Sequence, residues 1–80
     1  MYCSAQEGTK PFRFEWLKNG LALQISQHNI ETSEDESLFI IPKLTIQDSA
    51  NYSCIVRNEL ASDTQHTLLT VQGLIFVNLV

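Results

Sequence analysis

Two cysteines, Cys3 and Cys54, constrain the possible folds of this 80-residue chain more than any other feature. No C-x-x-C run or Cys/His spacing accompanies them, so zinc binding and a redox pair are both poor interpretations. A disulfide is the better interpretation, because a chain this short buries only about 60% of its unfolded surface and usually needs a covalent cross-link to be stable. Closing so long a loop would stabilise the fold by roughly 4 kcal/mol in an oxidising compartment. The pair therefore predicts a protein that works outside the cytosol.

The charge of the chain is weakly negative and evenly spread. Its formal net charge is -4 at pH 7. The basic residues never cluster and are Lys10, Arg13, Lys18, Lys43 and Arg57. This distribution argues against nucleic acid or an anionic membrane as a partner. The start "MYCSAQEG" lacks the basic and apolar regions of a secretory signal, and the apolar run 74–80 is far shorter than the roughly 20 residues of a membrane helix.

Short apolar-alternating runs broken by turn residues predict an all-β domain. The clearest run is "FRFEWLK", where Phe12, Phe14 and Trp16 alternate with charged residues. The dipeptide Asn19-Gly20 follows it and is a strong hairpin signal, because both residues accept positive φ. Further strands are expected at residues 1–5, 21–23, a stretch ending at the acidic turn 34–36, 37–44, 51–58 and 64–71. No segment has a sustained helical period.

The stretch "DSANYSC" places an acid, an alanine, a tyrosine and a cysteine at strict two-residue steps. Residues at i, i+2 and i+4 of a strand lie on one face, so Ala50, Tyr52 and Cys54 should point the same way. In the last expected strand the same alternation directs Thr67, Leu69 and Val71 inward.

These residues resemble the marks of an immunoglobulin domain. The family has a cysteine on each of two strands, a tryptophan that packs on their bridge and a tyrosine two residues before the second cysteine. Here the marks would be Cys3, Trp16, Tyr52 and Cys54. The resemblance implies an immunoglobulin-like β-sandwich in which the Tyr52 hydroxyl bonds to backbone upstream and Asp48 fixes the same corner. It further implies that three more residues face inward, namely Phe39, Ile41 and Leu44.

The finer resemblance is to the I-set. The runs "FEWLKNG", "LTIQDSANYSCIVRN" and "TLLTV" are similar to domains of the Down syndrome cell adhesion molecule (Dscam) family. Domains of that family stand in tandem on neuronal or immune-cell surfaces and bind identical copies of themselves. The resemblance therefore implies an extracellular adhesion module whose parent is anchored in the plasma membrane and whose partner is a second copy of that parent.

The chain also departs from the I-set pattern. Only Met1 and Tyr2 precede the first cysteine, whereas an I-set domain has two strands, A and A′, before it. Residues 1–72 are thus expected to form an I-set domain that is incomplete at its N-terminus and lacks these strands. Residues 73–80 form an apolar tail that resembles no domain start and stays unassigned.

Neither catalysis nor metal binding has a motif to support it. His28 and His66 stand apart, with no nucleophile or paired acid at motif spacing. The acidic run 34–36 lacks the alternating ligands and central glycine of an EF-hand loop, so a solvated turn is the expected structure. We therefore expect no enzyme, no cofactor and no metal site.

Asn51-Tyr52-Ser53 is a sequon for N-linked glycosylation, since its middle residue is not proline. Asn51 should point outward because Tyr52 points inward. Glycosylation at Asn51 is expected if the chain passes through the secretory path, and a chance sequon is the alternative.

Two outward apolar sets compete as the binding surface. One sheet would present Tyr2, Leu38 and Ile40 if Phe39 faces the core. The other would present Leu17, Ile55 and Leu68. The first set is favoured because self-recognition in Dscam-like domains uses that sheet, and scattered or covered residues are the alternative. A different class of function also stays open: an intracellular I-set scaffold domain of the muscle type, with both cysteines reduced.

Overall fold

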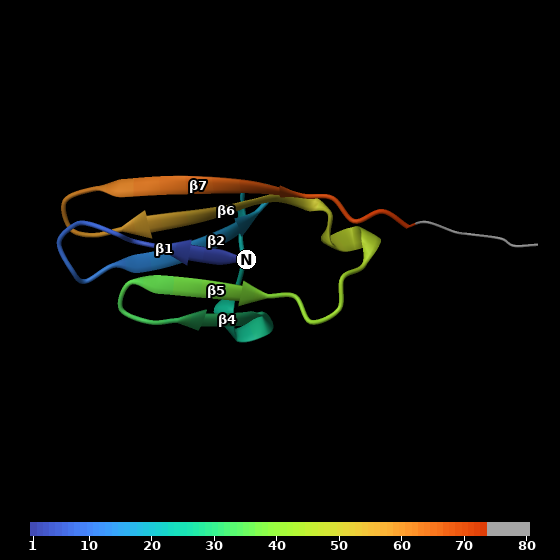
Figure 1. Ribbon diagram of the computed structural model, residues 1–80, viewed down its shortest axis with the longest axis horizontal. Helices are drawn as coiled ribbons and strands as arrows, with labels where there is room; N and C mark the ends of the chain where they lie inside the picture. Colours follow the sequence, from blue (N-terminus) through green and yellow to red (C-terminus); the bar gives the residue numbers. More distant parts are fainter. Residues whose placement is uncertain (74–80) are drawn as a thin grey trace, which may run out of the picture.

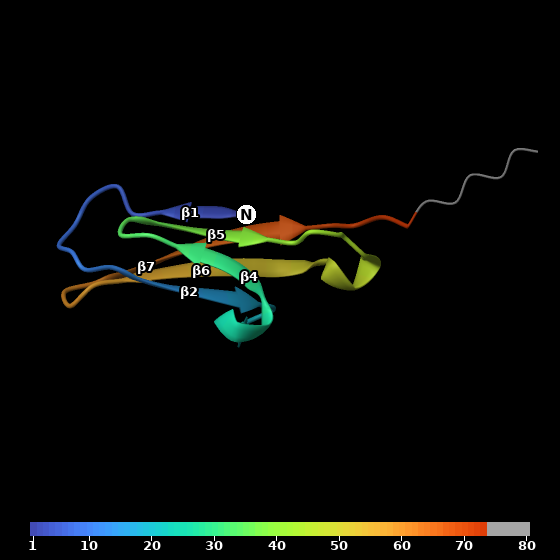
Figure 2. The ribbon, with the colours of Figure 1, turned by 90° about the horizontal axis from the view of Figure 1, so that it is seen from below.

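The fold is a sandwich of two antiparallel sheets, seen in a computed structural model that describes residues 1–73 (Figures 1 and 2). One sheet has the order β1-β5-β4 and the other the order β3-β2-β6-β7. The strands are β1 (Tyr2–Ser4), β2 (Arg13–Lys18), β3 (Leu21–Ala22), β4 (Asn29–Thr32), β5 (Glu36–Ile40), β6 (Ala50–Arg57) and β7 (Ser62–Leu69). Two short 3-10 helices, η1 (Ile25–Gln27) and η2 (Ile46–Asp48), lie between strands. The expected all-β immunoglobulin-like sandwich is confirmed.

The β2–β3 hairpin turns at Asn19 and Gly20, as predicted. Their φ angles are 50° and 81°, in the left-handed region that asparagine and glycine tolerate. Asn19 also continues the pairing of β2 with β6. Its backbone N–H donates to the Asn51 carbonyl at 2.8 Å, and its side-chain Oδ1 accepts from the Asn51 N–H at 2.9 Å.

The core between the sheets is small and largely aromatic. Phe39 of β5 lies between two rings of the opposite sheet, with centroid distances of 5.7 Å to Trp16 and 5.8 Å to Tyr52. Both contacts are edge-to-face, a favourable arrangement for aromatic pairs. The buried hydrophobic residues are Cys3, Trp16, Phe39, Ala50, Tyr52 and Cys54. All six were expected inside, Phe39 from the family resemblance and the other five from the two-residue alternation.

The Cys3–Cys54 disulfide joins the two sheets through this core. Cys3 lies on β1 and Cys54 on β6, with their Cα atoms 6.4 Å apart. No free cysteine is left in the chain. The disulfide predicted from the sequence is confirmed.

Ser37 holds the Trp16 indole in place, a role that the sequence did not reveal. Trp16 Nε1 donates to Ser37 Oγ at 2.9 Å, and Ser37 Oγ shares a second hydrogen bond with Thr32 Oγ1 at 2.9 Å. Ser37 is fully buried. A buried indole N–H needs such an acceptor. This need is the signal from which a hydroxyl opposite Trp16 could have been predicted.

The corner before β6 is fixed by Tyr52 and Asp48. The Tyr52 hydroxyl donates to the Asp48 carbonyl at 2.6 Å, while Asp48 Oδ2 accepts from the Thr45 N–H at 2.8 Å and closes a capping box on η2. Burial raises the pKa of Tyr52 above its ordinary value, and the Asp48 carboxylate adds to this effect. The structure thus places both residues as the family resemblance implied.

The prediction that Leu44 faces the core is wrong. Leu44 is 52% exposed. Strand β5 ends at Ile40, and the following link runs past the ends of the strands toward η2 (Figure 1), so Leu44 belongs to neither sheet. Pro42 in this link lacks the N–H that a ladder would need.

Two other positions depart from simple alternation. Thr67 faces the space between the sheets as expected but is exposed, because that side of the sandwich is open. Ser53 points to the outer face yet is only 4% exposed, because His66 of β7 covers it.

Candidate functional site

The outer face of the β1-β5-β4 sheet carries a short apolar row. Tyr2 and Leu38 are cross-strand partners, and Ile40 follows two residues after Leu38 on the same face. Their exposed fractions are 63%, 36% and 39%, respectively. The structure therefore brings together the three residues that the sequence favoured as a binding surface, which we call the apolar row.

Acidic side chains border the apolar row. Glu31 of β4 is the cross-strand partner of Leu38, and Glu36 precedes Leu38 by two residues on β5. The Tyr2 hydroxyl donates to Glu36 Oε2 at 2.6 Å, and this hydrogen bond raises the pKa of Tyr2 above its ordinary value. The outward positions of the three strands include no lysine or arginine. The sequence reasoning found the apolar residues of this face but missed its acidic border.

The competing set on the outer face of the β3-β2-β6-β7 sheet is not continuous. Leu68 is 76% exposed, but Leu17 and Ile55 are half-buried. The polar pair Ser53–His66, with Ser53 Oγ 2.8 Å from His66 Nδ1, lies between Leu68 and the other two. The structure therefore offers Leu68 as a single exposed side chain and not as part of a patch.

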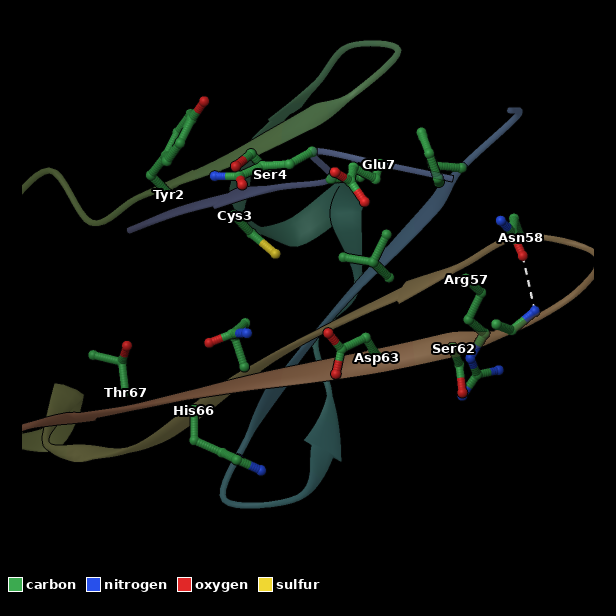
Figure 3. A pocket seen from close by; sticks show the side chains of 16 residues that line it. Tyr2, Cys3, Ser4, Glu7, Arg57, Asn58, Ser62, Asp63, His66 and Thr67 are labelled. Atoms are coloured by element: carbon green, nitrogen blue, oxygen red, sulfur yellow. Dashed lines mark hydrogen bonds between the residues drawn. The ribbon is translucent and has the colours of Figure 1, made fainter. Parts of the chain in front are cut away.

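An open groove of about 670 Å³ lies along the side of the sandwich between β1 and β7. Figure 3 shows Asp63 and Thr67 of β7 directed toward β1, whereas His66 points to the opposite side. Within residues 1–73, no further strand pairs with β1 or β7 on this side. The groove is thus the open seam between two sheets, and its lining is mostly polar.

The residues that the sequence analysis considered for metal binding or catalysis are His28, His66 and the acidic turn 34–36. Residues 1–73 contain no group of three or more His, Cys, Asp or Glu side chains that could hold a metal ion. His28 Nδ1 lies 2.9 Å from the Gln24 carbonyl, whereas His66 Nδ1 lies 2.8 Å from Ser53 Oγ. In the acidic turn, Glu34 Oε2 lies 3.4 Å from Lys10 Nζ.

None of the helices in the described part of the chain is long and apolar enough to cross a membrane.

Asn51 lies on the outer face of β6, where the alternation placed it. It is exposed, and its neighbour Tyr52 is buried in the core. Its cross-strand partner on β7 is Leu68.

The chain is similar to segments of much larger proteins. It is 38% identical over 64 residues to mouse hemicentin-1, in a match that covers 80% of this chain and 1% of that protein. It is 33% identical over 79 residues to the rat netrin receptor UNC5D, covering 98% of this chain and 8% of the receptor. The second match extends into residues 74–80. The chain therefore spans only a small part of the length of these relatives.

A solved structure shows the same fold. The I-band fragment I67-I69 from titin matches 89% of this chain and 25% of its own length, with a TM-score of 0.79 and 24% sequence identity. The family model of the immunoglobulin I-set domain matches residues 1–71. This family match agrees with the observed fold, in which two paired sheets are joined by the Cys3–Cys54 bridge beside Trp16. The chain belongs to the immunoglobulin I-set domain family.

Proposed function

We propose that this chain is an extracellular recognition domain of a multi-domain surface protein, and that it binds a second copy of its parent, as the Dscam-like resemblance suggests. The observation that carries this proposal is the apolar row, Tyr2, Leu38 and Ile40, exposed on the outer face of the β1-β5-β4 sheet. Contiguous apolar side chains on a small domain mark an interaction surface. Because both copies present the same row, a twofold contact can place one row against the other.

Two observations support an extracellular location. The disulfide between Cys3 and Cys54 uses both cysteines of the chain, and such bonds persist in oxidising compartments. A relative that matches nearly the whole chain is named as a netrin receptor. The alternative, an intracellular scaffold domain of the muscle type, requires the same two cysteines to be reduced. The two locations can be distinguished by isolating the parent protein under alkylating conditions, which block only reduced cysteines. Alkylation of both Cys3 and Cys54 would refute the extracellular proposal.

The homophilic contact is tested by Ile40→Asp in the parent protein. A carboxylate in the apolar row would have to be buried without a partner, so self-association should weaken at least tenfold while the domain stays folded. Sedimentation equilibrium measures the association, and circular dichroism checks the fold.

The matched control is Leu60→Asp, which adds the same charge at an exposed leucine of the β6–β7 loop, outside the apolar row. This variant should associate like the wild type. Unchanged association of Ile40→Asp would rule out the apolar row as the homophilic contact.

A further inference from the structure

We propose that Asn51 carries an N-linked glycan whose first sugars lie on Leu68, and that the glycan closes the outer face of the β3-β2-β6-β7 sheet to protein partners. The proposal rests on the proposed passage of the chain through the secretory path. It assigns a modification site and the side chain that the modification covers.

Asn51 is free to carry such a group. Its side chain is exposed and points away from the core, since Tyr52 on the opposite face is buried. Its backbone N–H bonds to Asn19 Oδ1, but its side-chain amide forms no hydrogen bond with any described residue. A glycan on the amide nitrogen therefore displaces no contact of the described fold.

The chemistry is a group transfer from a polyprenyl diphosphate-linked oligosaccharide. The Asn51 amide nitrogen attacks C1 of the first sugar and loses one proton, while the bond between C1 and the diphosphate oxygen breaks. The diphosphate leaves with the electron pair of that bond. The new N–C1 bond joins the sugar to the side chain, and the balance needs no oxidant or reductant.

The other two residues of the sequon, Tyr52 and Ser53, are buried in the folded domain. This burial determines when the sugar can be transferred. Tyr52 and Ser53 are 2% and 4% exposed, and the Ser53 hydroxyl is held by His66 at 2.8 Å. Strand β6 is also paired on both sides, with β2 and β7. An enzyme that must reach the Asn51 amide and the Ser53 hydroxyl together can do so only before β6 joins the sheet. The transfer therefore precedes folding.

Leu68 is the side chain on which the first sugars would pack. It is the cross-strand partner of Asn51, and such pairs have Cβ atoms roughly 5 Å apart on the same face. Leu68 is 76% exposed, and among residues 1–73 it has no apolar neighbour of similar exposure on this face. The C–H surface of a sugar ring over this side chain removes apolar area from water. The glycan thus accounts for an otherwise isolated exposed leucine, and it leaves the apolar row as the open face of the domain.

The first test is the occupancy of Asn51. The full chain is secreted from eukaryotic cells behind an added signal peptide, treated with an amidase that converts a glycosylated asparagine to aspartate, and analysed by peptide mass spectrometry. We expect conversion at Asn51 in the wild type and in Ser53→Thr, which keeps the hydroxyl, and a lighter, unmodified chain for Asn51→Gln. An unmodified wild-type chain would overturn the proposal. Occupied Asn51 in a parent that does not self-associate would overturn the homophilic function alone.

The second test is the contact with Leu68. We expect the glycosylated chain to melt about 4 °C above Asn51→Gln, as partial burial of one leucine in a domain of this size implies. The same comparison in a Leu68→Ser background should lose most of that difference. An equal difference in both backgrounds, or none in the wild type, would overturn the contact with Leu68 and leave only the modification.

Discussion

Single polar contacts determine how the core side chains of this domain are held. Trp16 and Tyr52 each end in a hydrogen-bond donor, and each donor has an acceptor: the Ser37 hydroxyl for Trp16 and the Asp48 carbonyl for Tyr52. None of the buried side-chain nitrogen or oxygen atoms in the described chain is left without a partner. In so small a core, each of these contacts is a large share of the net stability.

Tyr52→Phe should lower the free energy of unfolding by about 1–2 kcal/mol. The change keeps the ring but removes the hydroxyl that bonds to the Asp48 carbonyl. Urea unfolding followed by tryptophan fluorescence measures the loss. Tyr2→Phe is the matched control, because Tyr2 is 63% exposed and its change should stay within about 0.5 kcal/mol. Equal losses in both variants would contradict the role of the corner.

The same residue predicts how stability changes at alkaline pH. The pKa of Tyr52 is raised in the folded state, mainly by burial, so the folded domain holds its proton more tightly than the unfolded chain does. The stabilisation is therefore complete below the unfolded pKa of about 10 and is lost as the pH rises through the folded pKa. Between about pH 9 and pH 11, the wild type should lose more stability than Tyr52→Phe in otherwise identical urea titrations. Parallel curves would show that Tyr52 does not titrate differently in the two states.

At the level of elements, the β2–β3 hairpin does more than turn the chain. Asn19 supplies a backbone N–H and a side-chain carbonyl that pair with Asn51, so one residue adds two hydrogen bonds to the end of the β2–β6 ladder. It does this in a left-handed conformation, with a φ of 50°.

Substitutions at Asn19 should separate these two contributions. Asn19→Gly keeps the positive φ but loses Oδ1, and we expect a loss of about 1 kcal/mol. Asn19→Ala loses Oδ1 and also strains the turn, so the loss should be about 2 kcal/mol. Thermal unfolding of the two variants beside the wild type gives the order. A glycine variant less stable than the alanine variant would contradict the assigned conformation.

The elements could be predicted from the sequence where burial on one face repeats every second residue. Trp16, Phe39 and Tyr52 sit on such faces, and all three are buried as expected. Leu44 could not be placed, because its burial depends on where the link after β5 runs and no periodic pattern encodes that path. Ser53 and Ser37 were missed for a related reason: their burial comes from partners on other strands, His66, Trp16 and Thr32.

The candidate site was also predicted only in part from the sequence. Alternation together with the strand order that the immunoglobulin resemblance implied was enough to put Tyr2, Leu38 and Ile40 on one face, and the pairing of β1 with β5 places them there. It was not enough to rank the two sheets, since the exposure of Leu17 and Ile55 is set by side chains on neighbouring strands. The acidic border likewise depends on the register of β4 against β5, which the weak pattern of residues 24–33 did not define.

For the whole molecule, the disulfide is the main constraint on the unfolded chain. The double variant Cys3→Ala/Cys54→Ala should lose roughly 4 kcal/mol, because the unfolded chain regains the freedom of a 51-residue loop. A domain of this size has little stability to lose, so near-ultraviolet circular dichroism should show a chain that is mostly unfolded at 37 °C. The wild type in reductant should behave the same way and recover on oxidation. A cooperative transition near the wild-type midpoint in the double variant would show that the noncovalent core is sufficient.

The position of the bridge also decides how the domain would respond to tension. A force applied at the two ends of the chain passes from Cys3 directly to Cys54, so the 51-residue loop that holds β2 to β5 carries none of it. Only residues outside this loop, including those of β7, can be drawn out. At about 3.5 Å per residue, the loop withholds roughly 180 Å of length that a reduced domain would release. The extension of the oxidised domain is therefore shorter than that of the reduced domain by the length of this loop.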